Sequence, residues 1–231
     1  MGPKEDNTIV VIPSYNESRT IGEIVQSIVS MGYNVLVIDD GSTDDTQREA
    51  LDSGALVIRN KENLGKGLSV REGIRYVFEK MNYEWMIIMD GDGQHHPEDV
   101  PILIKAAKHD DADIIIGNRM VYPQTMPVVR YWTNKFTSWM VSRMCGQDIP
   151  DSQCGFRLIR VEALRKMRLK SERYDIESEM LVEAARNKMR IISAPIRTIY
   201  GKEVSEINPG RDTIKFFSLV LKYYFGKDGL R

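Results

Sequence analysis

WMIIMDGDGQHH, residues 85–96, is the stretch that decides the fold: a continuous apolar run that ends in two aspartates separated by one glycine. An apolar run of this length is typical of a strand that is buried on both faces. In an extended chain, side chains two residues apart face the same way, with their Cα atoms roughly 6–7 Å apart, so Asp90 and Asp92 would point together. Gly91 and Gly93 would let the backbone turn and a ligand approach closely. We therefore expect a buried strand that ends in a polar site.

Strand-like and helix-like stretches alternate on both sides of this run. Nearly continuous apolar strands separated by helices are typical of a doubly wound, mostly parallel sheet with helices on both faces, which predicts a Rossmann-like α/β fold. The pattern becomes less regular after residue 120, and we expect that part to complete the site as an extension of one domain over residues 1–231. The expected strands are 8–13, 34–40, 55–60, 85–90 and 112–119, followed by a helix at 130–144, a strand within 151–160, a helix at 175–189 and an extended segment at 190–200.

The expected strands share a second feature, because each ends in polar residues. In parallel α/β sheets, ligands bind beyond the carboxyl ends of the strands. Four polar strand ends on one edge therefore predict a binding site there. These ends are residues 13–17, 39–42, 90–92 and 117–119.

The aspartate-rich strand end indicates a hard metal ion. Asp90, Asp92 and Gln94 offer carboxylate and amide oxygens with no thiolate, and such ligands favour Mg²⁺ or Mn²⁺ over zinc. An acidic turn without a metal is the alternative interpretation of these residues taken alone. For His95 and His96 we expect a positioning or structural role.

The net charge of −1 hides an asymmetry along the chain. Residues 1–129 carry 12 Lys and Arg against 21 Asp and Glu, whereas residues 130–231 carry 20 against 12. An acidic first part suits a cation site and a basic second part suits an anionic partner, although chance clustering of surface charge is the alternative. We expect no nucleic-acid partner.

The remaining composition is ordinary for a soluble protein. Two cysteines do not make a disulfide framework, and no run approaches the roughly 18–20 apolar residues of a membrane span. The polar start MGPKEDN has no signal-peptide pattern. We therefore expect a cytoplasmic protein.

Six motifs, taken together and in this order, resemble the inverting GT-A glycosyltransferases of family 2, and within them the polyprenyl-phosphate sugar synthases of the dolichol-phosphate-mannose type. Each motif alone is weak, and together they cover most of residues 8–160. They are VVIPSYNE (Val10–Glu17), VIDDGSTD (Val37–Asp44), NLGKG (Asn63–Gly67), DGDGQH (Asp90–His95), GNR (Gly117–Arg119) and DSQCGFR (Asp151–Arg157).

The resemblance implies a GT-A fold in which residues 8–119 bind the nucleotide sugar and residues 120–231 serve the acceptor. It also implies that the DxD-like element places Mg²⁺ or Mn²⁺ on the donor diphosphate through Asp90, Asp92 and Gln94. Lys66 would assist there, with a merely solvated lysine as the alternative. The residues that match the family's donor-binding positions are Pro13, Tyr15, Glu17, Asp40, Lys66, Asp90, Gly91 and Asp92.

The resemblance assigns Arg119 and Arg130 to the acceptor phosphate. A lipid phosphate is already anionic, so it needs positioning more than deprotonation, and the planar fork of arginine matches phosphate. Asp151 would then orient the substrate, and the alternative is that it acts as a general base. For Arg157, the alternative to a role in the site is a purely structural one. We count Asp92, Arg119, Arg130 and Asp151 as the candidate catalytic residues.

The C-terminal part departs from the family pattern in YGKEVSEINPGR, where Glu206 stands in place of the usual lysine and Lys202 or Arg211 would have to substitute for it. Aromatic and basic residues in a predicted amphipathic helix at about 211–226 suggest an interfacial helix on anionic lipid, with a core helix as the alternative. We expect a protein peripheral to the cytoplasmic face of a membrane, alone or with a membrane-anchoring partner subunit.

The expected activity is metal-dependent, inverting transfer of a hexose from GDP-mannose or UDP-glucose to polyprenyl or dolichyl phosphate. One alternative is a family 2 transferase that acts on a hydroxyl acceptor in polysaccharide or glycan synthesis, which would need a carboxylate base. Another is a non-catalytic subunit that binds sugar nucleotides.

Overall fold

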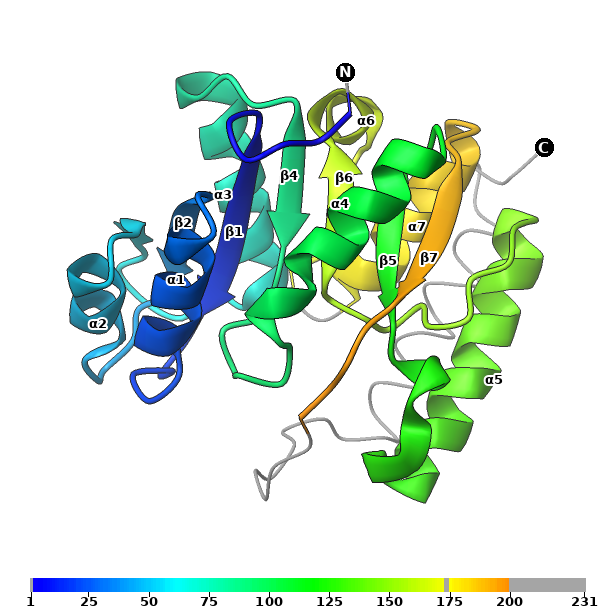
Figure 1. Ribbon diagram of the computed structural model, residues 1–231, viewed down its shortest axis with the longest axis horizontal. Helices are drawn as coiled ribbons and strands as arrows, with labels where there is room; N and C mark the ends of the chain where they lie inside the picture. The colour runs from blue at the N-terminus through cyan, green and yellow to red at the C-terminus, as the bar shows by residue number, and fades with distance from the viewer. Residues whose placement is uncertain (1, 173–174, 200–231) are drawn as a thin grey trace.

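The computed structural model describes residues 2–172 and 175–199. A seven-stranded sheet in the order β3-β2-β1-β4-β6-β5-β7 forms its centre, and Figure 1 shows helices on both faces of it. The expected α/β fold class is confirmed, and the single sheet contains strands from both parts of the sequence. The strands are β1 (Thr8–Ser14), β2 (Asn34–Asp39), β3 (Leu56–Arg59), β4 (Trp85–Ile88), β5 (Ile114–Asn118), β6 (Arg157–Arg160) and β7 (Ile191–Pro195).

One strand runs against the others. β6 pairs antiparallel with both β4 and β5, whereas β1, β2, β3 and β4 pair parallel and β7 pairs parallel with β5. The sequence predicted a strand at this place but not its direction or its central position. Because β6 is reversed, the loop before it, residues 151–156, lies at the carboxyl ends of the parallel strands.

The helices cover the sheet through apolar faces spaced at the helical period. In α1, Ile21, Ile24, Val25 and Ile28 are buried. Figure 1 shows α1 and α4 on one face of the sheet and α3 and α7 on the other. The helices are α1 (Ile21–Ser30), α2 (Thr46–Asp52), α3 (Lys66–Lys80), α4 (Val100–His109), α5 (Val128–Cys145), α6 (Val161–Lys166) and α7 (Ile176–Arg186), with short 3₁₀ turns η1 (Pro97–Asp99), η2 (Arg119–Val121) and η3 (Pro123–Thr125).

The central strands are buried on both faces, as the apolar runs predicted. All seven residues of β1 and all four of β4 are buried. Trp85 is 1% exposed, and the Arg160 guanidinium lies 4.5 Å from its ring centroid. Burying one large apolar side chain stabilises a fold by about 1.5–3 kcal/mol, so β1 and β4 form a rigid base for the loops that follow them.

The predicted helix at about 211–226 and the loop of residues 200–211 lie outside the described residues. Within residues 2–172 and 175–199, no helix combines the length and the apolar character that crossing a bilayer requires.

Candidate active site

The loops after β1 and β2 are tied together at the carboxyl edge of the sheet. The Asn16 amide donates to Ser42 Oγ at 2.9 Å, and the Thr43 amide donates back to Asn16 Oδ1 at 2.8 Å. Asn16 has φ 56°, the left-handed region that Asn tolerates better than most residues. Between these bonds, Tyr15 is 42% exposed, as a ring that packs on a ligand would have to be.

Glu17 and Pro13 occupy different depths in the same loop. The Glu17 amide donates to Thr46 Oγ1 at 2.8 Å, which fixes the backbone, and its side chain is half-buried. Pro13 is buried within β1 and contributes shape to the strand end. The structure thus brings Tyr15 and Glu17 to the rim and keeps Pro13 beneath it.

Asp40 anchors a neighbouring loop. Its carboxylate accepts hydrogen bonds from the Leu64 amide at 3.0 Å, the Gly65 amide at 2.7 Å and Asn60 Nδ2 at 2.8 Å. Asp40 is 3% exposed, so these bonds compensate a buried carboxylate. The side chain holds the Asn63–Gly67 loop in place, and direct contact with a nucleotide stays a prediction.

Lys66 lies between two carboxylates. As the first residue of α3, it places Nζ 2.6 Å from Asp90 Oδ1, just after β4, and 2.6 Å from Glu177 Oε1 in the first turn of α7. Burial alone would lower the pKa of Lys66, but the charges of Asp90 and Glu177 outweigh burial and raise it. Lys66 is therefore a paired, charged residue of the site, and the alternative of a solvated lysine is wrong.

Asp90 is held in a close-fitting position. Burial alone would raise its pKa, but the charges of Lys66 and then Arg119 help to lower it, so the carboxylate is ionised. A Cβ added to Gly155 would lie 2.7 Å from Asp90 Oδ2, and a Cβ added to Gly91 would collide with Ser14 Oγ. Only glycine leaves room for these contacts, which explains why residues 91 and 155 are glycines.

Asp92 and Gln94 form a turn beyond Asp90. The Gln94 amide donates to Asp92 Oδ1 at 2.9 Å, and Thr20 Oγ1 donates to the Gly91 carbonyl at 2.6 Å. The carbonyl of Gln94 accepts from the Ile199 amide at 2.9 Å, so the turn is tied to the segment after β7. The three expected oxygen donors thus lie on one short, well-held turn at the strand end.

A divalent cation fits these residues only if a ligand shares it. In the part of the chain that the structure describes, no three His, Cys, Asp or Glu side chains are grouped so that they could hold a metal by themselves. Asp90 and Asp92 supply two carboxylates, and Gly155 lets the Asp90 carboxylate lie directly against the backbone of the neighbouring loop. Mg²⁺ and Mn²⁺ commonly combine few protein carboxylates with phosphate oxygens, so the donor set suits them.

His95 is part of the wall of the site. It is 3% exposed, its ring centroid lies 5.4 Å from that of Phe156, and Nε2 lies 3.8 Å from Asp90 Oδ2. Burial lowers the pKa of His95 to about 4 against the opposing pull of Asp90, so the ring is neutral at neutral pH. Its position fits the expected structural role.

Arg119 and Asp151 form a second buried pair. Arg119 donates from Nε to Asp151 Oδ2 and from Nη2 to Oδ1, each at 2.8 Å, and its amide donates to Oδ2 at 3.0 Å. Asn134 Nδ2 of α5 adds a fourth bond to Oδ1 at 2.7 Å. Asp151 is 0% exposed; burial alone would raise its pKa, but Arg119 and then Asn134 lower it, so the group is an ionised, fully bonded carboxylate.

The other two arginines differ from Arg119. Arg130 lies in the first turn of α5 and is half-buried. Arg157 is 1% exposed and donates to the carbonyls of Cys154, Glu177 and Ser152 at 2.8, 2.6 and 2.8 Å. Three backbone carbonyls occupy its guanidinium, which supports the plain structural interpretation of Arg157: it joins the loop of residues 151–156 to α7.

Three residues of the site were not predicted from the sequence: Glu177, Asn134 and Gly155. Glu177 looks like a surface residue of an amphipathic helix, yet it is 7% exposed. A faint signal existed, because Glu177, Glu179 and Glu183 cannot all face solvent on one helix while its apolar residues face the sheet. Asn134 carried no signal beyond its helical setting.

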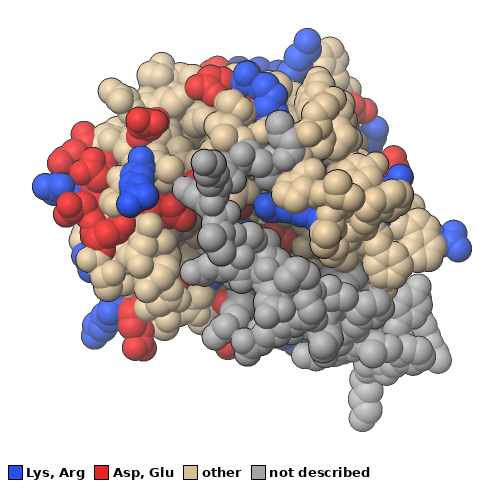
Figure 2. All heavy atoms as spheres, turned by 90° about the horizontal axis from the view of Figure 1, so that it is seen from below, with Lys and Arg blue, Asp and Glu red and all other residues tan. Residues whose placement is uncertain are grey.

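Charge is unevenly distributed around the rim. Figure 2 looks onto this edge of the molecule and shows Asp and Glu side chains gathered on the side of α1 and α2, with mostly uncharged side chains on the side of α5. The acidic side of this edge agrees with the excess of Asp and Glu over Lys and Arg in residues 1–129.

A comparison with protein families matches residues 9–168 to the family described as glycosyl transferase family 2. An uncharacterised protein of Methanocaldococcus jannaschii is 34% identical over 231 residues, 96% of this chain and 93% of its own. An undecaprenyl-phosphate mannosyltransferase of Micrococcus luteus is 32% identical over 86% of this chain and 85% of its own. A UDP-N-acetylglucosamine–dolichyl-phosphate N-acetylglucosaminyltransferase of Methanococcus voltae is 28% identical over 94% and 96%.

Among solved structures, glucosyl-3-phosphoglycerate synthase of Mycobacterium tuberculosis, in complex with Mn²⁺, UDP and glucosyl-3-phosphoglycerate, has a TM-score of 0.72. The match covers 94% of this chain and 79% of that chain at 18% identity. At that identity the likeness establishes the fold alone.

Proposed function

This chain belongs to glycosyltransferase family 2, and we propose that it transfers a hexose from a nucleoside-diphosphate sugar to the phosphate of a polyprenyl lipid. The observation that carries the proposal is Asp151, whose carboxylate accepts four hydrogen bonds, three from Arg119 and one from Asn134. A carboxylate occupied in this way is a poor general base, so an acceptor on that side should bring its own negative charge. A lipid phosphate does so.

Two relatives support the same acceptor class. The Micrococcus luteus and Methanococcus voltae proteins are named for transfer to undecaprenyl phosphate and dolichyl phosphate. Their sugars differ, mannose in one and N-acetylglucosamine in the other, so the names favour an acceptor rather than a donor. For the donor we propose GDP-mannose or UDP-glucose, with the N-acetylglucosamine donor as a third arm of the test.

On the donor side, Tyr15 packs against the nucleotide base, and Glu17 accepts from the base or the ribose. Asp40 acts through the Asn63–Gly67 loop that it anchors, and Lys66 brings positive charge towards the diphosphate while it pairs with Asp90. The exposure of Tyr15 supports its proposed role at the base, and the short contact between Lys66 and Asp90 supports the proposed role of Lys66 at the diphosphate.

A divalent cation would be held by Asp90, Asp92 and Gln94, and when bound it would neutralise charge on the departing nucleoside diphosphate. The chain's own contribution is placement. The Gln94 amide donates to Asp92, Gly155 leaves room for the Asp90 carboxylate, and the buried His95 ring lies with Nε2 3.8 Å from that carboxylate.

On the acceptor side, Arg119 and Arg130 bind the lipid phosphate, and Asp151 is a positioning residue that holds the Arg119 guanidinium in one plane. Attack from the face opposite the leaving diphosphate inverts the anomeric centre, so an α-linked donor yields a β-linked product. Because the acceptor is a membrane lipid, the protein works peripherally at a membrane surface, and we propose its cytoplasmic face.

The direct test is transfer of labelled sugar from GDP-mannose, UDP-glucose and UDP-N-acetylglucosamine, each with Mn²⁺, to a polyprenyl phosphate or to free sugar acceptors. We expect lipid-extractable product from one donor and none with the sugar acceptors. Transfer only to hydroxyl acceptors would overturn the proposal. If no donor is turned over, thermal shifts with each nucleotide sugar would indicate a non-catalytic binding subunit, because ligand binding raises apparent stability.

A hydroxyl-acceptor transferase is the second candidate, and one observation favours it. Glu177 is a buried carboxylate 2.6 Å from Lys66, and its Oε2 has no hydrogen-bond partner among the described residues, unlike the fully bonded Asp151. Glu177→Gln distinguishes the two functions. It should lower turnover modestly if Glu177 only positions Lys66, and should remove the acidic limb of the pH dependence and nearly all turnover if Glu177 takes a proton.

A further inference from the structure

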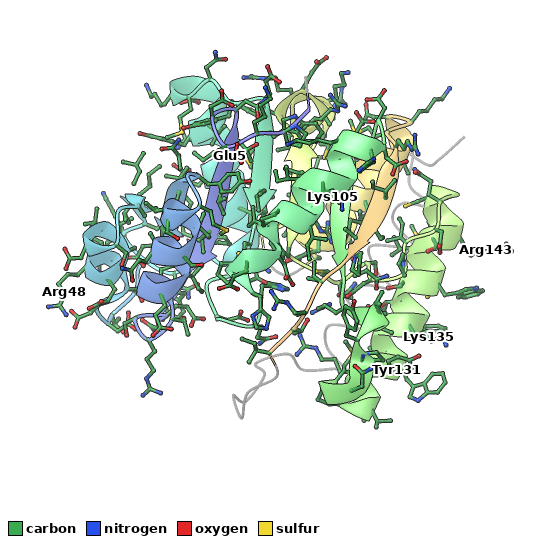
Figure 3. The ribbon with its side chains drawn as sticks, in the orientation of Figure 1. Glu5, Arg48, Lys105, Tyr131, Lys135 and Arg143 are labelled. Atoms are coloured by element: carbon green, nitrogen blue, oxygen red, sulfur yellow. The ribbon has the colours of Figure 1, made fainter. Side chains whose placement is uncertain are left out.

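The chain that follows β7, residues 196–199, lies along the carboxyl edge of the sheet, and we call it the β7 extension. Ile196 is 1% exposed, and its amide donates to the Asn118 carbonyl at 3.2 Å, at the end of β5. Three residues later, the Ile199 amide donates to the Gln94 carbonyl at 2.9 Å. Figure 3 shows this extension continuing below the sheet, on the same side as the loop before α4. The β7 extension therefore joins two of the strand ends that form the site.

An ion pair ties the middle of the β7 extension to the start of α4. Asp99, which is 1% exposed, accepts from the Arg197 amide at 2.7 Å, from its Nε at 2.9 Å and from its Nη2 at 2.6 Å. An aspartate directly before a helix ordinarily accepts a hydrogen bond from the first amides of that helix. Asp99 makes no such bond to α4. Its carboxylate is bonded instead to a residue 98 positions further along the chain.

Arg197 is the counter-charge of this buried carboxylate. The cations of α4 lie further along the helix: Lys105, which Figure 3 labels, and then Lys108 and His109 in the last turn. In the described part of the chain, the ion pair of Asp99 is with Arg197, whose side chain is 54% exposed. Removing the arginine side chain would leave the carboxylate with the backbone amide alone, which should loosen the β7 extension.

The β7 extension also lies against the turn of residues 90–95, which we call the metal turn after its proposed role. Thr198 and His95 form an isolated antiparallel bridge, and residues opposite one another in such a pair direct their side chains to the same face. His95 Nε2 in turn lies 3.8 Å from Asp90 Oδ2. Successive residues of the extension therefore contact the start of α4, then His95, then Gln94.

We propose that Arg197 and Asp99 are positioning residues for the metal turn. Their ion pair holds the β7 extension in the register in which the Ile199 amide meets the Gln94 carbonyl. That contact fixes Gln94, whose own amide donates to Asp92 Oδ1 at 2.9 Å. The pair thus holds two of the three oxygen donors in place without touching a ligand itself. The inference rests on the proposed function in one respect: it takes the metal turn to bind a divalent cation.

The competing explanation is a pair that only joins β7 to α4, and the chain contains the matched control. At the other end of the same two elements, Arg190 donates from Nη2 to Asp110 Oδ1 at 2.8 Å. The side chains of Arg190 and Arg197 are each 54% exposed. A general joining role should make the two pairs equivalent, whereas a positioning role should give only the pair at the site an effect on the metal turn.

Hydrogen exchange of the full-length protein without metal tests the coupling by itself. Arg197→Met should speed exchange of the Gln94 and Ile199 amides by about tenfold or more, because the hydrogen bonds that protect them open more often. The fold should persist, since the Arg197 amide still bonds to Asp99. Arg190→Met should leave both rates unchanged. Equal rates in Arg197→Met and the unchanged protein, or equal acceleration in both variants, would overturn the proposal.

Metal binding without turnover provides the second measurement. The electron paramagnetic resonance signal of free Mn²⁺, recorded with GDP and with UDP, gives the affinity of the full-length protein for the ion. Arg197→Met should weaken binding by about tenfold, because partners that orient metal ligands commonly contribute 10–100-fold. Arg197→Lys keeps the charge and should recover part of the loss, and Arg190→Met should bind like the unchanged protein. Adding Asp99→Asn to Arg197→Met should cause little further loss, since both changes break one contact. Fully additive losses would contradict the pairing.

Transfer assays separate this inference from the proposed function. In Arg197→Met, the Mn²⁺ concentration for half-maximal rate should rise about tenfold, while the rate at saturating Mn²⁺ and the KM of the lipid acceptor should stay close to those of the unchanged protein. Mn²⁺ binding without transfer to any lipid phosphate would overturn the proposed acceptor alone. No Mn²⁺ binding by the unchanged protein would overturn the metal site itself. Mn²⁺ binding and transfer that Arg197→Met leaves unaffected would overturn the positioning role alone.

Discussion

Two buried clusters of charge lie at the rim of this sheet, and they differ in how completely their carboxylates are bonded. The first, which we call the donor cluster after its proposed role, consists of Lys66, Asp90 and Glu177; the Lys66 ammonium lies 2.6 Å from each of the two carboxylates. The second, which we call the acceptor cluster after its proposed role, consists of Asp151, Arg119 and Asn134; Asp151 forms a bidentate pair with Arg119 and accepts a further hydrogen bond from Asn134.

The difference teaches what each cluster is suited to do. Arg119 and Arg157 also act on the two carboxylates that Lys66 faces, and Asp92 on the adjacent turn adds a further carboxylate that would attract a cation. A carboxylate with four donors and an arginine is neutral as a pair and geometrically fixed, which suits it to hold a shape rather than to react. Under the proposed function, the donor cluster would bind a cation and the acceptor cluster would position the acceptor.

The largest expected effect tests the donor cluster. Asp92→Asn should lower turnover by about 10³-fold, because the amide cannot neutralise a cation that stabilises the leaving diphosphate. The fold should persist, since Asp92 lies on a half-buried turn. Turnover with and without Mn²⁺, together with the thermal midpoint, measures both. Asp111→Asn, at a side chain that is 94% exposed, is the matched control. Near-normal transfer by Asp92→Asn in the presence of a metal chelator would contradict the proposed metal site in the donor cluster.

The next effect tests the acceptor cluster through stability. Arg119→Met should lower the free energy of unfolding by about 3–5 kcal/mol, because it leaves the Asp151 carboxylate buried without a counter-charge. The double variant Arg119→Met with Asp151→Leu should recover most of that loss. Denaturant titration measures both variants.

An exposed pair gives the control for that cycle. Arg48 pairs with Asp45 at side-chain exposures of 63% and 65%, so Arg48→Met should change stability by less than about 1 kcal/mol. If Arg119→Met were equally mild, the acceptor cluster would not be the rigid, buried pair described above.

A smaller effect tests the space beside Asp90. Gly155→Ala places a Cβ 2.7 Å from Asp90 Oδ2, so the carboxylate must move. Turnover should fall about tenfold and the Mn²⁺ concentration for half-maximal rate should rise, and the free energy of unfolding should fall by about 1–3 kcal/mol because the added methyl group displaces the carboxylate. Gly22→Ala on α1, where the added Cβ meets only the flexible side chains of Ser53 and Glu49, should leave both kinetic values unchanged. An unchanged metal dependence in Gly155→Ala would show that Asp90 does not set it.

The smallest effect is a pH dependence of stability. Because Arg119 and Asn134 outweigh burial and lower the pKa of Asp151 in the folded protein, its stabilising contribution is present above the usual Asp pKa of about 3.9. It is lost as pH falls through the lower folded pKa, at up to about 1.4 kcal/mol per pH unit. Denaturant titrations between pH 5 and pH 2 should therefore show the gap between the unchanged protein and Asp151→Asn narrowing. A constant gap would mean that the carboxylate is not ionised when folded.

Much of the architecture could be predicted from local pattern. The apolar runs around residues 9–12 and 85–88 predicted buried central strands, because a strand that is buried on both faces lacks the alternation of polar and apolar residues. The polar strand ends predicted the site, because the carboxyl ends of parallel strands lie at one edge of the sheet. The direction of β6 could not be predicted in this way, since an antiparallel strand buried on both faces has the same apolar pattern as a parallel one.

The sequence by itself determined the order of strands and helices, the family, and the presence of Asp90 and Asp92 at a strand end, because these depend on neighbours in the chain. Only the tertiary structure decided which charges meet: that Lys66 lies between Asp90 and Glu177, that Asp151 is saturated by Arg119 and Asn134, and that Asp99 pairs with Arg197. The physical reason is distance. A charge or a ring acts on whatever lies within a few ångströms of it, and those neighbours come from segments far apart in the chain.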